Sequence, residues 1–478
     1  MRRFAFVLVL LSAAYLTPVS ARADDLDRRV AEQMHTNAAR YGIAGQAVLV
    51  RHNGQRLVHA VAGDADIAAH RPVTAQTVFN VYSLAKLLTS TLVMQRVESG
   101  DIALDAPASR YLPGLPVRWQ AITVRQFLDH ASGVPEYFQS RDGVVSTAQG
   151  PGLPPTLPAV WAMLDGQPLQ FAPGSANRYT QTNYLVLTAL LEAQYQQPYA
   201  RIVEQRILRP LGLQHTWLGP PPSARRDRAL GYIGRAGVLQ REDDVAWPSY
   251  AHGHAALHTT LADLDRFVQA MSRGELVSRS ALYGLWQPQA LADGRTGGFA
   301  SGWEYEESGA YREVGHDGGT RVRVRIAFKD GLDGDRYSFI YLTNGSAKNV
   351  WSRTLVDSTM ALVAPRAFPR QTLTERLITH ALQAGGDRDS AALQQWLRTD
   401  TGIAASDLER EINRAGYAIR ENLGNAAGLE VFQLNTELFP RSANTWDSLA
   451  ETCAAMGDQR NAARYLARAR QLASPAAD

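Results

Sequence analysis

The chain has 478 residues, of which 45% are hydrophobic and 20% are charged. This balance is typical of a globular protein, and the length favours two domains. Lys and Arg number 49 against 46 Asp and Glu, so the charge gives no indication of nucleic-acid binding. The single cysteine, Cys453, excludes a disulfide bond within the chain.

Residues 1–23 have the pattern of a secretory signal peptide. An Arg2-Arg3 pair precedes an apolar stretch, and Ala21-Arg22-Ala23 forms a small-residue cleavage site before Asp24. The alternative is a membrane anchor, but the stretch is shorter than the roughly 20 residues of a spanning helix. We therefore expect a periplasmic or secreted bacterial protein with a cleaved leader and no stable membrane anchor. The arginine pair leaves Sec and twin-arginine export both open.

The N-terminal part of the mature chain predicts a helix and then a hairpin. Residues 24–41 have helical spacing, and β-prone runs at 45–50 and 56–61 surround Asn53-Gly54. Asn-Gly between two apolar runs is a strong signal for a hairpin turn.

A serine and a lysine stand at the next strand-to-helix junction. A β-prone run ends in Ser83, and apolar residues with helical spacing follow from Leu84. Residues three apart share one face of a helix, so we expect Lys86 beside the Ser83 hydroxyl. A lysine with a lowered pKa can take the proton of a serine and make it a nucleophile. Lysine is otherwise found only at Lys329 and Lys348, which favours a specific role over a helix cap followed by a solvated lysine.

The middle of the chain predicts mostly helices. Residues 122–128 begin a helix that stops at Gly133, and residues 141–157 are rich in Gly and Pro, which indicates a surface loop. From 157 to 267 the pattern is mainly helical. Helices are expected at 184–194, 200–207 and 261–271.

Beyond Ser301 the hydrophobic period changes to that of strands. Four β-prone runs are separated by turns at Gly309 and Asp330-Gly331, and they predict consecutive antiparallel strands at 303–305, 310–314, 322–328 and 337–343. Strands at both ends with helices between them predict an α+β fold. One antiparallel sheet is built from the two ends, and a helical insertion separates them.

Past Pro369 the chain is rich in Ala, Arg, Gln and Leu and has no strand signal. A 34-residue period relates Gly416 to Ala450, Gly428 to Ala462 and Phe432 to Leu466. Small residues at this period resemble tetratricopeptide repeats, although an ordinary helical hairpin tail is the alternative. We expect a main domain at 24–365, a helical linker at 366–405 and an all-α repeat segment at 406–478 that packs on the main domain or on a protein partner.

Two further segments carry candidate chemistry. Tyr179-Thr180-Gln181 lies in a loop just before a predicted helix, where a tyrosine could relay a proton. Gly315-His316-Asp317-Gly318-Gly319 is expected to open a strand, with glycines where backbone approaches a ligand closely.

With these segments in view, residues 25–363 resemble the serine β-lactamase and penicillin-binding protein family, in the branch of class C β-lactamases, D-alanyl-D-alanine carboxypeptidases and esterases. The resemblance rests on Ser83-Leu84-Ala85-Lys86, on Tyr179-Thr180-Gln181 at the Tyr-x-Asn position and on His316-Asp317-Gly318 at the Lys-Thr-Gly or His-x-Gly position. Supporting stretches follow in order at 128–135, 173–174, 208–213 and 301–303.

The resemblance implies a role for each matched residue. Ser83 attacks the acyl carbonyl, Lys86 takes or shares its proton, and Tyr179 passes a proton to the leaving group. The N–H groups of Ser83 and Gly319 form the oxyanion hole. The remaining residues, expected to contact substrate, are Gln181, His316 and Gly318.

Two departures from the family pattern bear on the substrate. Gln181 stands where the family usually has asparagine, which changes the reach of the amide. His316 replaces a lysine, so a permanent cation for a substrate carboxylate is missing. Both favour the peptidase and esterase side of the branch over a dedicated β-lactamase.

A histidine-rich stretch offers a second kind of site. His252, His254 and His258 have a spacing that could hold a metal, but a further ligand is wanting, and loop histidines are the more common explanation. We expect neither a metal nor a cofactor.

Two functions of different classes follow. The first is an exported serine hydrolase that forms an acyl-enzyme at Ser83 and cleaves amides or esters, such as peptidoglycan D-Ala-D-Ala peptides, β-lactams or small esters. The alternative is a weakly active or inactive scaffold protein whose helical repeats recruit a partner.

Overall fold

A computed structural model describes residues 19–141, 144–147, 150–220, 226–242, 245–319, 321–383 and 390–473. The predicted leader lies mostly outside these residues. The first described helix, α1 (Val19–Tyr41), runs across the expected cleavage position. Within the described chain, we find no helix with the length and apolar character needed to cross a bilayer.

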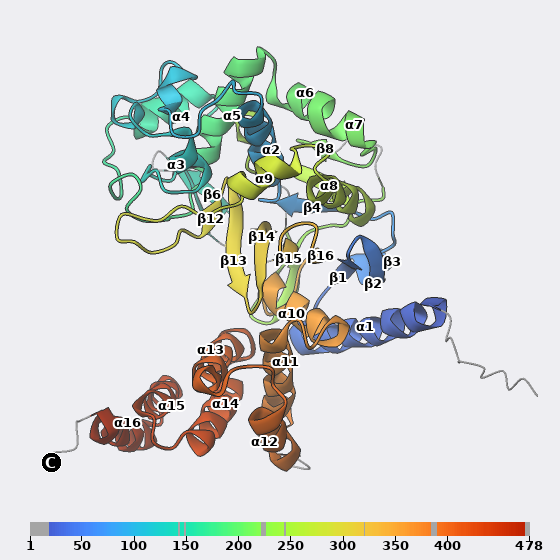
Figure 1. Cartoon of the computed structure of the whole chain (residues 1–478), viewed down its shortest axis with the longest axis vertical. Coiled ribbons are helices and arrows are strands. Elements are labelled where there is room, and N and C mark those ends of the chain that lie inside the picture. The colour runs from blue at the N-terminus through green and yellow to red at the C-terminus, as the bar shows by residue number, and fades with distance from the viewer. Residues whose placement is uncertain are drawn as a thin grey trace, which may run out of the picture.

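An eight-stranded antiparallel sheet forms the centre of the protein (Figure 1). Its strands, in spatial order, are β12 (Phe299–Ala300), β13 (Trp303–Ser308), β14 (Tyr311–Gly318), β15 (Val322–Lys329), β16 (Asp335–Thr343), β1 (Gly45–His52), β2 (Gln55–Asp66) and β3 (Arg71–Pro72). The N-terminal β1 pairs with β16, with His52 opposite Tyr337. The prediction of one sheet from both ends of the chain is confirmed.

The β1–β2 turn forms where the sequence predicts it. Asn53 and Gly54 both have positive φ values, 49° and 83°. Asparagine and glycine reach this left-handed region at low cost, which is why they favour a two-residue hairpin turn.

Each face of the sheet packs against its own set of helices. Alternate residues of β1 point to opposite sides, so Ala47 and Leu49 join one hydrophobic core while Val48 and Val50 join another. The first core lies under the helical insertion. The second is covered by α1 and α10 (Ser352–Val363), as Figure 1 shows.

The helical insertion is built around α2 (Ala85–Glu98) and α5 (Thr182–Tyr195). Ten consecutive residues at the start of each helix are buried, so both are core helices without a solvated stripe. α8 (Leu261–Arg273) packs beside the sheet, and a small second sheet joins β4 (Val78–Tyr82) to β11 (Leu257–Thr260) and β8 (Trp217–Leu218).

The surface-loop prediction for residues 141–157 is wrong in part. Three short strands lie there: β5 (Gln139–Arg141), β6 (Val144–Thr147) and β7 (Gly150–Pro151). Val144 and Val145 have high β propensity, which favours extended backbone. Likewise β9 (Tyr232–Arg235) and β10 (Val238–Arg241) form a hairpin inside a region expected to be mainly helical.

The C-terminal residues form only helices in the part that the structure describes. They are α11 (Pro369–Leu382), α12 (Ser390–Thr399), α13 (Ala405–Leu423), α14 (Asn425–Leu438), α15 (Ala443–Ala455) and α16 (Gln459–Ala473). α11 and α12, within the predicted linker, share a hydrophobic core with α13 and α14. A Cβ on Gly416 would lie 2.6 Å from the Phe432 ring, so a small residue is needed where α13 meets α14.

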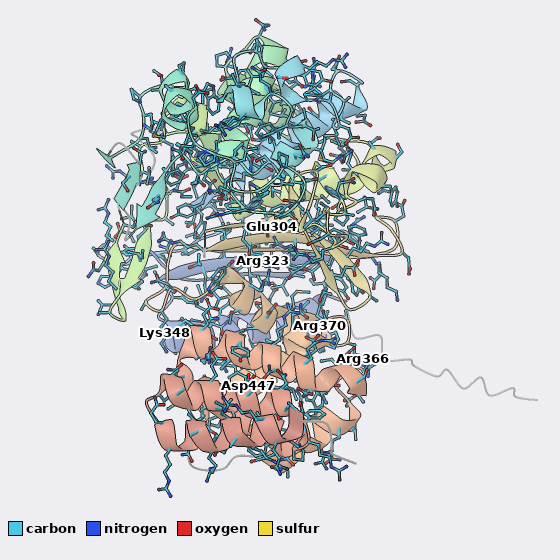
Figure 2. All side chains as sticks on the ribbon, turned by 90° about the vertical axis from the view of Figure 1, so that its left-hand side faces the viewer. Glu304, Arg323, Lys348, Arg366, Arg370 and Asp447 are labelled. Atoms are coloured by element: carbon cyan, nitrogen blue, oxygen red, sulfur yellow. The ribbon has the colours of Figure 1, made fainter. Side chains whose placement is uncertain are left out.

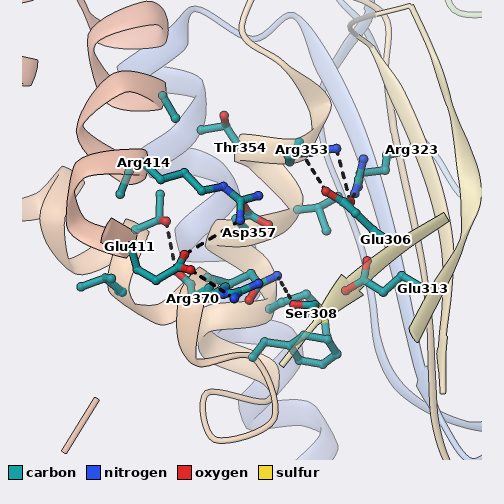
Figure 3. A pocket seen from close by; sticks show the side chains of 18 of the residues that line it. Glu306, Ser308, Glu313, Arg323, Arg353, Thr354, Asp357, Arg370, Glu411 and Arg414 are labelled. Carbon is teal, nitrogen blue, oxygen red and sulfur yellow. Dashed lines mark hydrogen bonds and ion pairs between the residues drawn. The ribbon is translucent and has the colours of Figure 1, made fainter. Parts of the chain in front are cut away.

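A charged seam joins these helices to the sheet (Figures 2 and 3). A cavity of 150 Å³ lies between β13, β14, α10, α11 and α13. Glu306 pairs with Arg353 at 3.2 Å and with Arg323 at 3.3 Å, and Arg370 pairs with Glu411 at 3.1 Å. These helices contact the sheet through hydrogen bonds from α11 to β13: Arg370 donates to the Glu307 carbonyl oxygen and Gln371 to Ser308 Oγ, each at 3.4 Å.

Candidate active site

Ser83 and Lys86 occupy the first turn after β4. Tyr82, the last residue of the strand, has φ +47°, and this turn aims the chain into α2. The Lys86 backbone N–H donates to the Ser83 carbonyl at 3.0 Å. The expected strand-to-helix junction, with both side chains on one face, is therefore present.

The Lys86 side chain is completely buried and has three oxygen neighbours. Its Nζ lies 3.3 Å from Ser83 Oγ, 2.6 Å from Gln181 Oε1 and 3.0 Å from the His254 carbonyl oxygen. Burial holds the pKa of Lys86 well below its usual range, because the charged form loses hydration. The carboxylates of Glu136 and Glu304 act in the opposite direction. A lysine in this setting can be neutral at far lower pH than a solvated lysine.

Tyr179 reaches the same point from the loop before α5. Lys86 Nζ lies 4.9 Å from the centre of its ring, and its hydroxyl is close enough to the Ser83 side chain to interact with it. The residue is 38% exposed overall, whereas its hydroxyl is at the buried end, where loss of hydration raises the pKa of the phenol. The phenol therefore keeps its proton in the resting site.

Gln181 stands at the N-terminal boundary of α5, immediately before Thr182. Its amide contacts Lys86, so the extra methylene relative to asparagine still allows a hydrogen bond to the lysine. The backbone N–H of Gln181 donates to Glu136 Oε2 at 2.8 Å. The hydrogen bond to Glu136 thus fixes the backbone from which the Gln181 side chain extends.

The Gly315–Gly319 segment ends a strand instead of opening one, which corrects the prediction. β14 runs from Tyr311 to Gly318, and β15 starts only at Val322. The apolar residues that suggested a strand after Gly319 belong to β15, on the other side of the turn. A Cβ on Gly318 would lie 2.3 Å from the Val81 carbonyl oxygen, so β14 runs directly against the strand that leads to Ser83. Gly319 has φ +59° and open space at its Cα.

His316 is buried beside Tyr179, with ring centres 5.7 Å apart. Its Nδ1–H donates to the Asp317 carbonyl at 2.6 Å, while Nε2 has no partner among the described residues. Burial lowers the pKa of His316, although Glu304, 3.6 Å from Nδ1, opposes this. The histidine is therefore a neutral group at ordinary pH.

The structure adds residues to which sequence reasoning gave no role. His130 is buried, its Nδ1 accepts hydrogen bonds from Thr180 N and Asn183 Nδ2 at 3.3 Å and 2.9 Å, and its ring lies 4.5 Å from that of Tyr179. His130 could have been singled out from the sequence because it lies in the 128–135 stretch that supports the family resemblance. Glu136 directly follows that stretch, whereas the His254 contact is made by a backbone carbonyl, which no side-chain pattern reveals.

The three histidines of the considered metal site have separate partners. His254 Nε2 pairs with the Tyr137 hydroxyl at 2.8 Å, His252 Nε2 with the Trp247 carbonyl at 3.3 Å, and His258 stacks on Trp217. Across the described ranges, no three His, Cys, Asp or Glu side chains are grouped to hold a metal ion.

Comparisons with known proteins agree with this geometry. A family model described as beta-lactamase matches residues 26–354. The chain is 26% identical over 328 residues to penicillin-binding protein 4* of Bacillus subtilis (strain 168), covering 65% of this chain and 70% of the relative. It is 29% identical over 234 residues to a beta-lactamase of Escherichia coli (strain K12), covering 48% and 56%. A D-aminopeptidase of Brucella abortus (strain S19) is 26% identical over 293 residues, covering 60% and 54%. The chain thus spans just over half the length of the last two relatives.

Solved structures share the fold. EstCE1, a hydrolase with promiscuous acyltransferase activity, aligns with a TM-score of 0.59 at 20% identity, covering 71% of this chain and 99% of that one. The D-amino acid amidase from Ochrobactrum anthropi SV3 aligns with a TM-score of 0.58 at 21% identity, covering 71% and 98%. The family match over most of the chain and the Ser83–Lys86 geometry lead to one conclusion: the protein belongs to the β-lactamase family and is a serine hydrolase of that family.

Proposed function

We propose that the protein forms an acyl-enzyme at Ser83 and hydrolyses amide or ester bonds. The observation that carries the proposal is the buried Lys86, whose Nζ lies 3.3 Å from Ser83 Oγ and whose pKa is held low by its surroundings. An amine in this place can accept the serine proton, and a solvated lysine could not do so near neutral pH.

The reaction follows from the positions of the three side chains. Neutral Lys86 accepts the proton of Ser83 while Oγ bonds to the carbonyl carbon of the substrate. The N–H groups of Ser83 and Gly319 stabilise the oxyanion. Tyr179 donates its proton to the leaving amine or alcohol and regains one from Lys86, which returns to its neutral form. A water molecule then hydrolyses the acyl-enzyme by the reverse sequence of proton transfers.

We propose further that preferred substrates carry no carboxylate next to the scissile bond on the leaving side. A lysine on β14 would offer such a group a permanent cation, whereas His316 is buried and neutral. The nearest arginine beyond β14, Arg321, is already paired with Glu242 at 2.6 Å and donates to the Tyr82 hydroxyl at 2.6 Å. Amino-acid amides and small esters fit this environment better than D-Ala-D-Ala peptides or β-lactams.

Intact mass of the protein after treatment with a fluorophosphonate, and separately with penicillin, tests the acylation step. We expect a fluorophosphonate adduct on the wild-type protein that is missing from Ser83→Ala. An unmodified wild-type protein that also hydrolyses neither ester nor amide would contradict the proposal and favour the scaffold alternative.

Substrate preference is tested by comparing D-alanine amide and p-nitrophenyl acetate with a D-Ala-D-Ala peptide. We expect the amide and the ester to be cleaved with the higher kcat/KM. His316→Lys should move the ratio toward the peptide if the neutral ring causes the preference, and an unchanged ratio would assign the preference to other residues.

Export and a protein partner are also part of this proposal. The pattern of residues 1–23 supports a cleaved leader. In the 406–478 segment, a groove of 640 Å³ supports the expected partner surface, and it is lined by Gln433, Thr436, Glu437, Trp446, Leu449, Arg464, Tyr465 and Arg468.

A further inference from the structure

Glu136 lies just after the stretch that ends at Pro135, facing the loop that carries Tyr179 and Gln181. Its carboxylate accepts two backbone hydrogen bonds, from Gln181 N at 2.8 Å and from Tyr137 N at 2.9 Å. Burial raises the pKa of Glu136, and the backbone hydrogen bonds from Gln181 and Tyr137 oppose this while fixing the orientation of the carboxylate.

These contacts connect Glu136 to the reacting serine in three steps. Glu136 fixes the backbone of Gln181, the Gln181 amide oxygen lies 2.6 Å from Lys86 Nζ, and Lys86 lies 3.3 Å from Ser83 Oγ. Because Gln181 is one methylene longer than the asparagine usual in the family, its amide has an additional rotatable bond. A fixed backbone limits where that amide can go.

We propose that Glu136 is a positioning residue for acylation, which holds Gln181 against Lys86 and supplies the negative charge that stabilises Lys86 after it has taken the serine proton. The inference rests on the proposed function of Ser83 and Lys86. Glu136 itself does not touch the substrate carbonyl.

The electrostatic part depends on what surrounds Lys86. Burial lowers the pKa of Lys86, and the Coulombic attraction of Glu136 is the largest opposing effect, ahead of that of Glu304. The other titratable side chains that interact with the lysine or lie against it are uncharged in their usual forms here; they are Tyr179, Tyr184, His130, His254 and His316. Glu136 and Glu304 are therefore the two carboxylates with the strongest Coulombic effect on Lys86.

Removing the charge of Glu136 has two measurable consequences. The pKa of Lys86 falls further. The limb of the pH–rate profile in which the rate rises as Lys86 loses its proton therefore moves to lower pH. The loss of a nearby opposite charge changes a pKa by about one unit. At the same time neutral Lys86 becomes a weaker base, so the plateau rate above the limb falls, by about threefold for a Brønsted slope near one half. A purely structural role would lower the rate and leave the limb in place.

The experiment measures the rate of Ser83 modification by a fluorophosphonate between pH 5 and 10 in wild type, Glu136→Gln and Glu136→Asp. We expect the limb of Glu136→Gln to lie about one pH unit lower. Glu136→Asp keeps the charge but withdraws it by one methylene, so its limb should stay close to that of wild type while the rate falls.

Glu192→Gln is the matched control. Glu192 Oε1 accepts the backbone N–H of Tyr199 at 2.8 Å, which is the same kind of contact, but Glu192 is not among the groups that shift Lys86. Its profile should match wild type. Equal limbs in Glu136→Gln and wild type overturn the inference, as does a limb in Glu136→Asp shifted as far as in the glutamine variant. An unreactive wild-type protein contradicts the proposed function instead.

Discussion

The amide oxygen of Gln181 lies 2.6 Å from Lys86 Nζ, closer than either of the other two oxygens around that nitrogen. The longer side chain has therefore not lost the lysine. The Gln181 amide oxygen accepts a hydrogen bond from Lys86, and the Gln181 backbone is fixed by Glu136.

Gln181→Asn is expected to slow acylation. The shorter amide withdraws from Lys86, and a hydrogen bond to a charged or ionising group is worth about 1.5–3 kcal/mol. We expect kcat/KM for p-nitrophenyl acetate to fall about tenfold or more. A variant as fast as wild type would show that asparagine and glutamine are interchangeable here.

Asp129 should make the folding free energy depend on pH. It is 4% exposed, its Oδ1 accepts the Gly302 N–H at 2.9 Å, and its Oδ2 has no partner among the described residues. Burial raises the pKa of Asp129 from 3.8 to about 7. The folded state therefore binds this proton more tightly than the unfolded state. The resulting stabilisation is full below about pH 4 and is lost as the pH rises to about 7.

Asp129→Asn removes that dependence. We expect the stability of wild type relative to the variant to fall by about 1.4 kcal/mol per pH unit between pH 4 and 7. Urea denaturation of both proteins at pH 5 and pH 7 measures the difference. A difference that is the same at the two pH values would indicate that Asp129 is ionised throughout.

Gly318→Ala is expected to separate β14 from the nucleophile strand. The new methyl group would lie 2.3 Å from Val81 O and 2.2 Å from Val322 Cγ2, so the strands must move apart near Ser83. We expect at least a tenfold loss of kcat/KM, because misplacing reacting groups by about 1 Å can cost about a hundredfold.

Gly298→Ala is the control for this change. Nothing lies within 4 Å of the position its methyl group would take, and its backbone is outside the left-handed region. Its activity and thermal stability should remain close to wild type. Equal losses in both variants would point to a general effect of losing a glycine.

The proposed leader gives a simple measurement. Expressed from its full sequence in a bacterium, the protein should be recovered from the periplasm with Asp24 as its first residue, because Ala21-Arg22-Ala23 supplies the cleavage motif. N-terminal sequencing determines this, and a protein that keeps residues 1–23 would contradict the leader.

Local patterns in the sequence predicted much of the fold because their signals are strong. Asn53-Gly54 determined a hairpin through backbone conformation, and the Ser83–Lys86 spacing determined a shared helix face. The short strands at 139–151 and 232–241 escaped prediction because two to four residues carry too little periodicity to distinguish a strand from a loop. His316 was placed at the wrong end of its strand because a glycine-rich turn adjoins strands on both sides.

The sequence predicted only those parts of the site that are formed by side chains with distinctive chemistry. Ser83, Lys86, Tyr179 and Gln181 meet as expected, since each has a distinctive chemistry. His254 contributes a backbone carbonyl that any residue could supply, and the effect of Glu136 depends on which backbone N–H groups it meets. Such contacts arise only from the tertiary fold.

The pairing of β1 with β16 imposes an order on biosynthesis. Residues 45–66 leave the ribosome long before residues 335–343, so the first hairpin must wait, with one edge unpaired, for a partner made much later. Ser83 is synthesised early as well, but β14 reaches it only once the same late segment has joined the sheet. A chain that ends before residue 335 therefore carries Ser83 without the strands that bring β14 to its site.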